Sequence, residues 1–247
     1  MEKMKKLTVL AMVLLFVAST SQAQVVESEE ESELVETTIA ADFVSQYVWR
    51  GQDLGNASLQ PTLGIAWKGL SLTAWGSVGV ADANDTKEID LTLEYNIGGL
   101  NIGITDYWTN QGADPQNRYF KYDAHGTNHV FEANVGYDFG PVALQWYTNF
   151  AGNDGVNDKG KRAYSSYVEM TVPFQLAKVE WEAAAGAVPF ETDFYGTTGF
   201  AVTNLSVKAT KEVKLNDKFS IPLFAQFAAN PCDRKAYLVF GMTLQPW

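Results

Sequence analysis

Short stretches in which apolar and polar residues alternate fill most of the chain after residue 38. In the clearest of them, residues 88–97, every second residue from Ile89 to Ile97 is apolar and the residues between are polar or charged. Successive side chains of a β-strand point to opposite sides, so this pattern predicts strands with one apolar and one polar face. Twelve strands are predicted, at residues 39–50, 58–68, 70–81, 88–97, 100–109, 128–139, 142–151, 163–174, 178–188, 200–210, 218–229 and 236–245.

The predicted strands are long for a soluble protein. Most have about ten residues, close to the roughly 9–11 of a tilted membrane-spanning strand, whereas a typical soluble strand has about 5–6. Short turns mostly alternate with longer loops, as they do in outer-membrane barrels. An even strand count lets the sheet close, and lipid requires closure because it cannot satisfy a free sheet edge. We therefore predict an all-β fold, a twelve-stranded antiparallel transmembrane β-barrel over residues 38–247, in the outer membrane of a Gram-negative cell.

Aromatic residues at outward positions gather near the predicted strand ends, which is typical of the two aromatic girdles of membrane barrels. The group near the longer loops is Tyr47, Trp49, Trp108, Phe131, Phe150, Tyr164 and Phe200, and the group near the short turns is Trp67, Tyr95, Tyr137, Phe139, Phe174 and Phe219. The alternation breaks near Asn204, which predicts a β-bulge in that strand.

The first 37 residues have a different composition. Residues 1–23 combine a lysine-rich start, an apolar run and a Ser-Gln-Ala end, the pattern of a secretory signal peptide. The apolar run is shorter than the roughly 20 residues of a spanning helix. Residues 24–37 are rich in glutamate and poor in large apolar residues, which predicts an acidic disordered tail. The alternative for this tail is a docking segment for a basic partner.

Charge restricts the partners. The formal net charge is −11, which argues against nucleic acid, so outer-membrane lipid and small solutes are the expected partners. No cofactor is expected, and the sequence gives no oligomeric state. The single cysteine, Cys232, excludes an internal disulfide. Asn153, Asp154, Asn157 and Asp158 carry oxygen ligands suited to Ca²⁺, but their spacing does not match an EF-hand, so no metal site is predicted.

The polar faces of the strands are the candidate site. The predicted channel-lining residues are Asp42, Arg50, Asp90, Glu94, Glu132, Asp138, Glu169, Lys178, Glu180 and Glu182. Carboxylates outnumber cations in this set, and an acidic lumen favours cations. The predicted function is a porin-like channel for passive diffusion of small polar or cationic solutes. Arg50 would form the constriction, facing Asp42, Glu94 or Glu132.

Two alternatives stay open. Barrels of about eight strands are filled and those of 16–18 hold channels, so a closed barrel that acts through its extracellular loops is an alternative. In it, Trp75 and Tyr167 would narrow the bore and the loop 110–127 would fold in as a plug. The other is an outer-membrane lipid hydrolase that uses His129. It requires a serine activated by that histidine, and because no matching motif flanks His129, we predict no enzyme.

Motifs near the start of the barrel resemble a known family, the outer-membrane porins of the Gcw_chp or TorF type. The resemblance implies an outer-membrane β-barrel with a channel role and no established catalytic set. It is specific over residues 38–80 and only architectural beyond them. The motifs are Tyr47-Val48-Trp49-Arg50-Gly51, Gln60-Pro61 and Ala74-Trp75-Gly76-Ser77.

Overall fold

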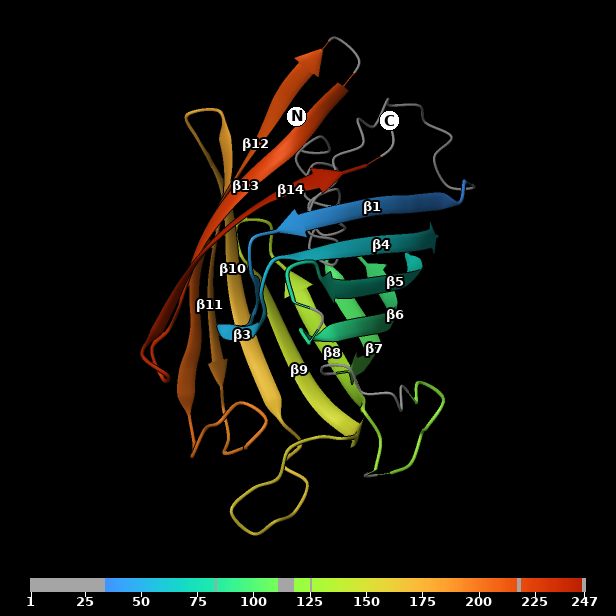
Figure 1. The fold of residues 1–247 in the computed structure, drawn as a ribbon, viewed down its shortest axis with the longest axis vertical. Coiled ribbons are helices and arrows are strands. Elements are labelled where there is room, and N and C mark those ends of the chain that lie inside the picture. The colour runs from blue at the N-terminus through green and yellow to red at the C-terminus, as the bar shows by residue number, and fades with distance from the viewer. Residues whose placement is uncertain (1–33, 83, 111–117, 125, 217–218, 246–247) are drawn as a thin grey trace.

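The computed structural model describes residues 34–82, 84–110, 118–124, 126–216 and 219–245. The predicted signal peptide and most of the predicted acidic tail lie outside these ranges. The described chain forms a closed antiparallel β-barrel of twelve strands (Figure 1), which confirms the predicted fold class. The described ranges contain no helix that is long and apolar enough to cross a membrane.

Each wall strand pairs with the next along the chain, and β1 pairs with β14 to close the barrel. Between β1 and β4 the chain forms a separate two-stranded hairpin, β2 (Tyr47–Trp49) and β3 (Gln52–Gly55). The wall consists of β1 (Glu36–Val44), β4 (Ser58–Trp67), β5 (Leu70–Gly79), β6 (Lys87–Ile97), β7 (Leu100–Asn110), β8 (His129–Asp138), β9 (Ala143–Gly152), β10 (Ser166–Leu176), β11 (Val179–Val188), β12 (Ala201–Asn216), β13 (Phe219–Asn230) and β14 (Lys235–Leu244).

The two ends of the barrel differ. At one end, called the turn end here, β1 begins, β14 ends and the strand connections are tight. The β4–β5 connection is the pair Lys68 (φ 49°) and Gly69 (φ 85°), two left-handed residues as in the hairpin turn that matches strand twist. The opposite end, called the loop end, carries the longer connections. The pair β12 and β13 projects beyond its neighbours at the turn end (Figure 1).

The outer wall is apolar although it is exposed. On each strand the alternation places apolar residues, such as Leu91 of β6, on the outer face and polar residues on the inner face. The exposed belt includes Leu63, Ile65, Leu72, Ile89, Leu91, Leu93, Ile102, Ile104, Val135, Leu144, Met170, Leu205, Leu223, Phe227, Leu238 and Phe240. The predicted turn-end aromatic group flanks this belt, with Trp67, Tyr95, Tyr137, Phe139 and Phe174 all exposed. An apolar band with an aromatic rim is the surface that a barrel presents to lipid.

The wall departs from regular pairing at the β11–β12 ladder and at the β1–β14 seam. The ladder between β11 and β12 shifts register, because Gly186 pairs with Asn204 but Ala187 pairs with Val202. This confirms the predicted bulge and identifies Thr203 as the extra residue. The second irregularity is the seam between β1 and β14, where the pairing of the described residues joins Ala41–Val44 with Gly241–Leu244, whereas β1 pairs with β4 along its whole length.

Candidate functional site

The lumen is occupied by a hairpin that the sequence did not reveal. β1 ends at Val44, and the following residues, 45–57, fold into the barrel as the lumen hairpin (Figure 1). At its tip, Trp49 pairs with Gln52 across Arg50 (φ 50°) and Gly51 (φ 78°), again a two-residue turn of left-handed residues. The prediction that Tyr47 and Trp49 extend the first strand toward lipid is therefore wrong. Tyr47 is buried, and Trp49 packs against buried rings of the interior.

The tip of the lumen hairpin lies against the inner face of β12 and β13. A Cβ atom on Gly51 would lie 1.9 Å from the carbonyl oxygen of Thr203, so only glycine fits there. Asn230 of β13 donates a side-chain hydrogen bond to the Gly51 carbonyl at 3.2 Å. The bulge at Thr203 and the glycine at the tip thus together bring the two backbones into contact.

Arg50 anchors the hairpin to the wall. Its guanidinium donates twice to Glu132 of β8, from Nη1 to Oε2 at 2.6 Å and from Nη2 to Oε1 at 2.9 Å. The two side chains are 7% and 2% exposed. Nη1 also donates to the Tyr195 hydroxyl at 2.7 Å, and the Tyr107 hydroxyl donates to Glu132 at 2.9 Å. This two-pronged, buried pairing is the strong form of an arginine–carboxylate contact.

Aromatic rings enclose the same guanidinium. The Arg50 Cζ atom lies 4.2 Å from the ring centroid of Trp49, 4.1 Å from that of Tyr147 and 4.6 Å from that of Tyr167. Each face of this kind attracts a cation. Gly186 makes room for Tyr167, because a Cβ atom there would lie 1.8 Å from the tyrosine hydroxyl. We call Arg50, Glu132 and these rings the Arg50 clamp.

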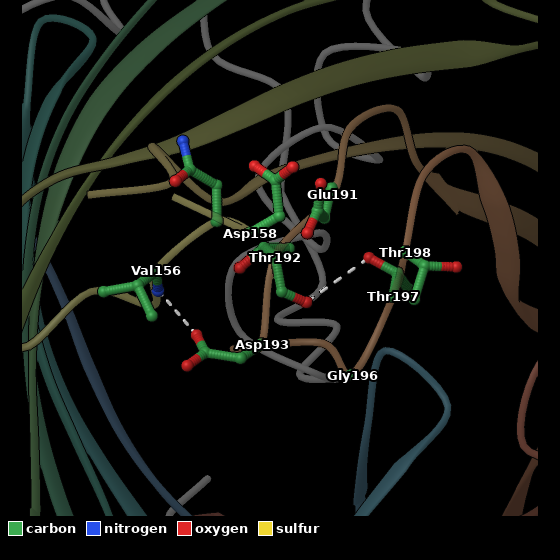
Figure 2. Close-up of a pocket in the computed structure, with 9 residues that line it drawn as sticks. Val156, Asp158, Glu191, Thr192, Asp193, Gly196, Thr197 and Thr198 are labelled. Carbon is green, nitrogen blue, oxygen red and sulfur yellow. Dashed lines mark hydrogen bonds between the residues drawn. The ribbon is translucent and has the colours of Figure 1, made fainter. Parts of the chain in front are cut away.

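Two loops cover the clamp from the loop end. Tyr195 reaches Arg50 from the loop 189–200, which is joined to the loop 153–165 by a hydrogen bond of 2.6 Å from the Val156 amide to Asp193 (Figure 2). The bridged pair Thr192 and Thr197 shapes the same loop. A cavity of about 350 Å³ lies between the loops, lined by Val156, Asn157, Asp158, Glu191, Thr192, Asp193, Gly196, Thr197 and Thr198.

The lumen face between the turn end and the clamp is polar. Some of its inward residues, such as Ser71 and Ser206, are half-buried, and others, such as Glu94, are buried. Asp42 accepts a hydrogen bond of 2.6 Å from Thr243, and Asn101 donates to Glu94 at 3.3 Å. We call this polar part of the lumen the polar vestibule.

The predicted channel-lining residues separate into two groups. Arg50 meets Glu132, one of the three partners expected for it, and Asp42, Asp90, Glu94 and Glu132 are buried on the lumen side of the wall. Glu169 accepts from Tyr167 of the clamp at 2.5 Å, and Glu182 is half-buried. The second group lies at the turn end: Asp138 caps the Gly140 amide at 2.7 Å, Lys178 occupies the turn before β11, and Glu180 is exposed.

Sequence reasoning missed Tyr107, Tyr147 and Tyr195 as members of the site. Tyr107 and Tyr147 fall on lumen-facing positions of their strands, but the pattern gives no sign that an arginine from a distant hairpin lies between them. The pair Arg50-Gly51 was the one sign of a hairpin in the sequence, because glycine is favoured at the second position of a two-residue turn.

The long loop between β7 and β8 does not plug the bore where it is described. Residues 118–124, the outer-loop segment, lie against the outer wall, where the ring of Tyr122 stacks on His129 at 4.2 Å between centroids. His129 is fully buried beneath the segment. Its Nδ1 is 2.8 Å from Asp106 and its Nε2 is 2.5 Å from the Tyr119 carbonyl. Both ring nitrogens are therefore occupied by contacts with other groups. The hydrolase alternative needs a serine hydroxyl on one of these nitrogens.

The outer-loop segment also changes one girdle position. Trp108 is buried rather than lipid-facing, with its ring 5.4 Å from that of Tyr119. Phe150, Tyr164 and Phe200 are exposed near the loop end, as predicted.

Comparisons with solved structures return other β-barrels at low similarity. The COG4313 outer membrane channel from Pseudomonas putida F1 is 12% identical, with 88% of this chain and 98% of that chain covered and a TM-score of 0.38. Salmonella typhi OmpF in complex with daunomycin is 9% identical, covering 90% and 100%, with a TM-score of 0.34. CdiB from Acinetobacter baumannii is 11% identical over 85% of this chain, with a TM-score of 0.39, and this chain spans 59% of it.

No family model and no curated protein matches the sequence. The resemblance to the Gcw_chp or TorF porins therefore stays a prediction. The description of this chain as a barrel rests on its own strand pairing.

Proposed function

We propose that this chain is an outer-membrane channel for small polar or cationic solutes, held closed by its own lumen hairpin. The observation that carries the proposal is the Arg50 clamp. A segment separate from the wall lies in the bore and is linked to the wall through side chains of β8, β9 and β10. A segment with a discrete anchor can undock as a unit, which is how channel and lid segments switch.

The placement in an outer membrane is supported by the wall. The exposed belt of the closed sheet is apolar all the way round. Lipid offers no hydrogen-bond partners, so a sheet can span it only when closure pairs all backbone groups between strands. Short turns at one end and long loops at the other support an orientation with the turn end in the periplasm and the loop end outside the cell. The polar vestibule would then open to the periplasm and the Arg50 clamp would close the outer half.

The preference for cations is supported by the charge of the lumen face. Asp42, Asp90 and Glu94 are buried there in addition to the paired Glu132. Rings of carboxylates favour cations over anions by direct Coulomb attraction. Lys208, whose Nζ lies 4.3 Å from the ring centroid of Phe224, offsets part of this charge near Asp42.

The test is single-channel recording of the refolded protein in a planar bilayer under a salt gradient. We expect rare openings with a cation-selective reversal potential for the unmodified chain, and a many-fold higher open probability for Arg50→Ala. Arg118→Ala is the matched control, because it removes an exposed arginine from the outer-loop segment and leaves the lumen intact. Silence from both folded variants would contradict the channel and favour the closed barrel that acts through its loops.

A further inference from the structure

Two carboxylates of β6 lie in the interior with oxygen atoms that nothing satisfies. Glu88 and Asp90 are 6% and 8% exposed and stand two residues apart, on the same face of the strand. Glu88 Oε2 and Asp90 Oδ1 are buried without a hydrogen-bond partner. Two neighbouring buried carboxylates repel each other, and the repulsion is relieved by something positive between them, either a proton or a cation.

The surroundings supply neutral oxygen atoms. The Tyr47 hydroxyl of the lumen hairpin contacts Glu88, and Ser77 is the cross-strand neighbour of Glu88 on β5. The Ser77 hydroxyl in turn receives a hydrogen bond of 3.4 Å from Gln60. Carboxylate, hydroxyl and amide oxygens are the ligands that hard cations such as Ca²⁺ prefer. Within the described ranges no three Asp, Glu, His or Cys side chains meet as a metal site, so the other ligands would be neutral.

The buried arginine of the lumen, Arg50, is committed to another carboxylate. Arg50 is already bonded through both terminal nitrogens to Glu132. Asp90 feels the negative charge of Glu132 in addition to that of Glu88. One shared proton would leave one buried negative charge uncompensated, whereas one divalent cation neutralises both.

We propose that Glu88 and Asp90 bind one divalent cation of the Ca²⁺ type, with Tyr47 of the lumen hairpin lying over it. Because Tyr47 contacts Glu88 only when the hairpin is docked, the cation and the docked hairpin stabilise each other. Binding itself does not depend on the channel. The effect on opening rests on the proposed function: added Ca²⁺ would lower the open probability.

The probe is Tb³⁺, which takes Ca²⁺ sites and emits when a nearby aromatic ring is excited. Trp75 and Tyr107 are the cross-strand neighbours of Asp90, so the bound ion would sit beside two sensitising rings. The full chain, refolded in detergent, should show sensitised Tb³⁺ emission that added Ca²⁺ removes. The double variant Glu88→Gln with Asp90→Asn keeps the shape and removes both charges, and it should lose at least nine-tenths of the emission.

A matched control addresses the other acidic cluster. Asp158→Asn with Glu191→Gln alters the cavity of Figure 2 by the same chemistry and should leave the emission unchanged. If the Glu88 and Asp90 variant does not fold, as judged by its gel mobility with and without heating, Trp75→Phe serves instead. That variant should lose most of the emission and still bind Ca²⁺ by calorimetry.

The proposal is overturned if the unmodified chain gives no Ca²⁺-sensitive emission, or if the loop-cavity control loses the emission and the lumen variant keeps it. Absence of emission together with protonation of the pair would identify a shared proton in place of the cation. Tb³⁺ binding in a protein that is silent in the bilayer would overturn the channel and leave the cation site standing.

Discussion

Replacing Arg50 by methionine tests how firmly the lumen hairpin is held. Methionine keeps the apolar stem and removes all hydrogen bonds and charge. It leaves Glu132, which is 2% exposed, as a buried carboxylate with only the Tyr107 hydroxyl as partner. Removing one partner of a buried ion pair costs about 3–5 kcal/mol. The three aromatic faces around the guanidinium add roughly 0.5–2 kcal/mol to that loss.

This free energy acts on the docking of the hairpin because the clamp exists only in the docked state. A loss of 3–5 kcal/mol corresponds to a shift of about two to three and a half orders of magnitude in the docking equilibrium, at ~1.4 kcal/mol per decade. Hydrogen exchange of the segment 45–57, followed by mass spectrometry in detergent, reports this equilibrium directly. The exchange should accelerate by that factor or until it reaches the rate of an exposed segment.

The control is the double variant Arg50→Met with Glu132→Leu. It removes the orphaned charge as well, so most of the penalty should disappear, leaving about 1–2 kcal/mol for the unpaired hydroxyls of Tyr107 and Tyr195. Folding of both variants is checked by heat-dependent gel mobility. Exchange in Arg50→Met within threefold of the unmodified chain, or equal exchange in the single and double variants, would refute the clamp.

Three further substitutions probe the hairpin, the outer loop and the wall. Gly51→Ala places a Cβ against the Thr203 carbonyl at a left-handed φ of 78°, so the hairpin should exchange at least tenfold faster; unchanged exchange would contradict the close approach. His129→Ala removes the contacts that hold the outer-loop segment, so trypsin should cleave that segment several-fold faster, and equal cleavage would mean that the aromatic stacking suffices. Leu91→Arg puts a charge at the middle of the lipid-facing wall and should lower the free energy of unfolding, measured by urea titration in vesicles, by about 2–4 kcal/mol. Thr92→Arg, on the lumen side, should lower it less. A larger loss for Thr92→Arg would mean that the two faces of the strand are assigned the wrong way round.

The wall could be predicted from the sequence because lipid on one side and polar side chains on the other impose a strict period of two. The strand at 88–97 and the bulge near Asn204 were both readable in that pattern. The extension of β12 to Asn216 could not be predicted in this way, because β12 has no paired residue on β11 beyond residue 210 to impose the pattern.

The hairpin was missed because alternation continues smoothly through it. Tyr47 and Trp49 keep the parity of β1, and the same residues that suit a lipid-facing strand also suit the interior of a plugged lumen. Arg50 was placed in the lumen, facing Asp42, Glu94 or Glu132, for the wrong structural reason, as the last residue of a wall strand. Pairings across the bore, such as that of Arg50 with Tyr195, depend on how loops fold inward, and local pattern does not encode that.

The short seam between β1 and β14 has a consequence for how the barrel is made. The two strands lie about as far apart in the sequence as this barrel allows, so their pairing closes the longest loop in the chain and belongs to the slow, late part of folding. Once formed, it offers few ladder bonds against fraying. The lumen hairpin compensates from within, because it follows β1 directly and is hydrogen-bonded to β8 across the bore and to β13 beside the seam strand β14. It therefore serves as an internal brace that slows the reopening of the seam, and a loosened clamp would shorten the lifetime of the closed barrel.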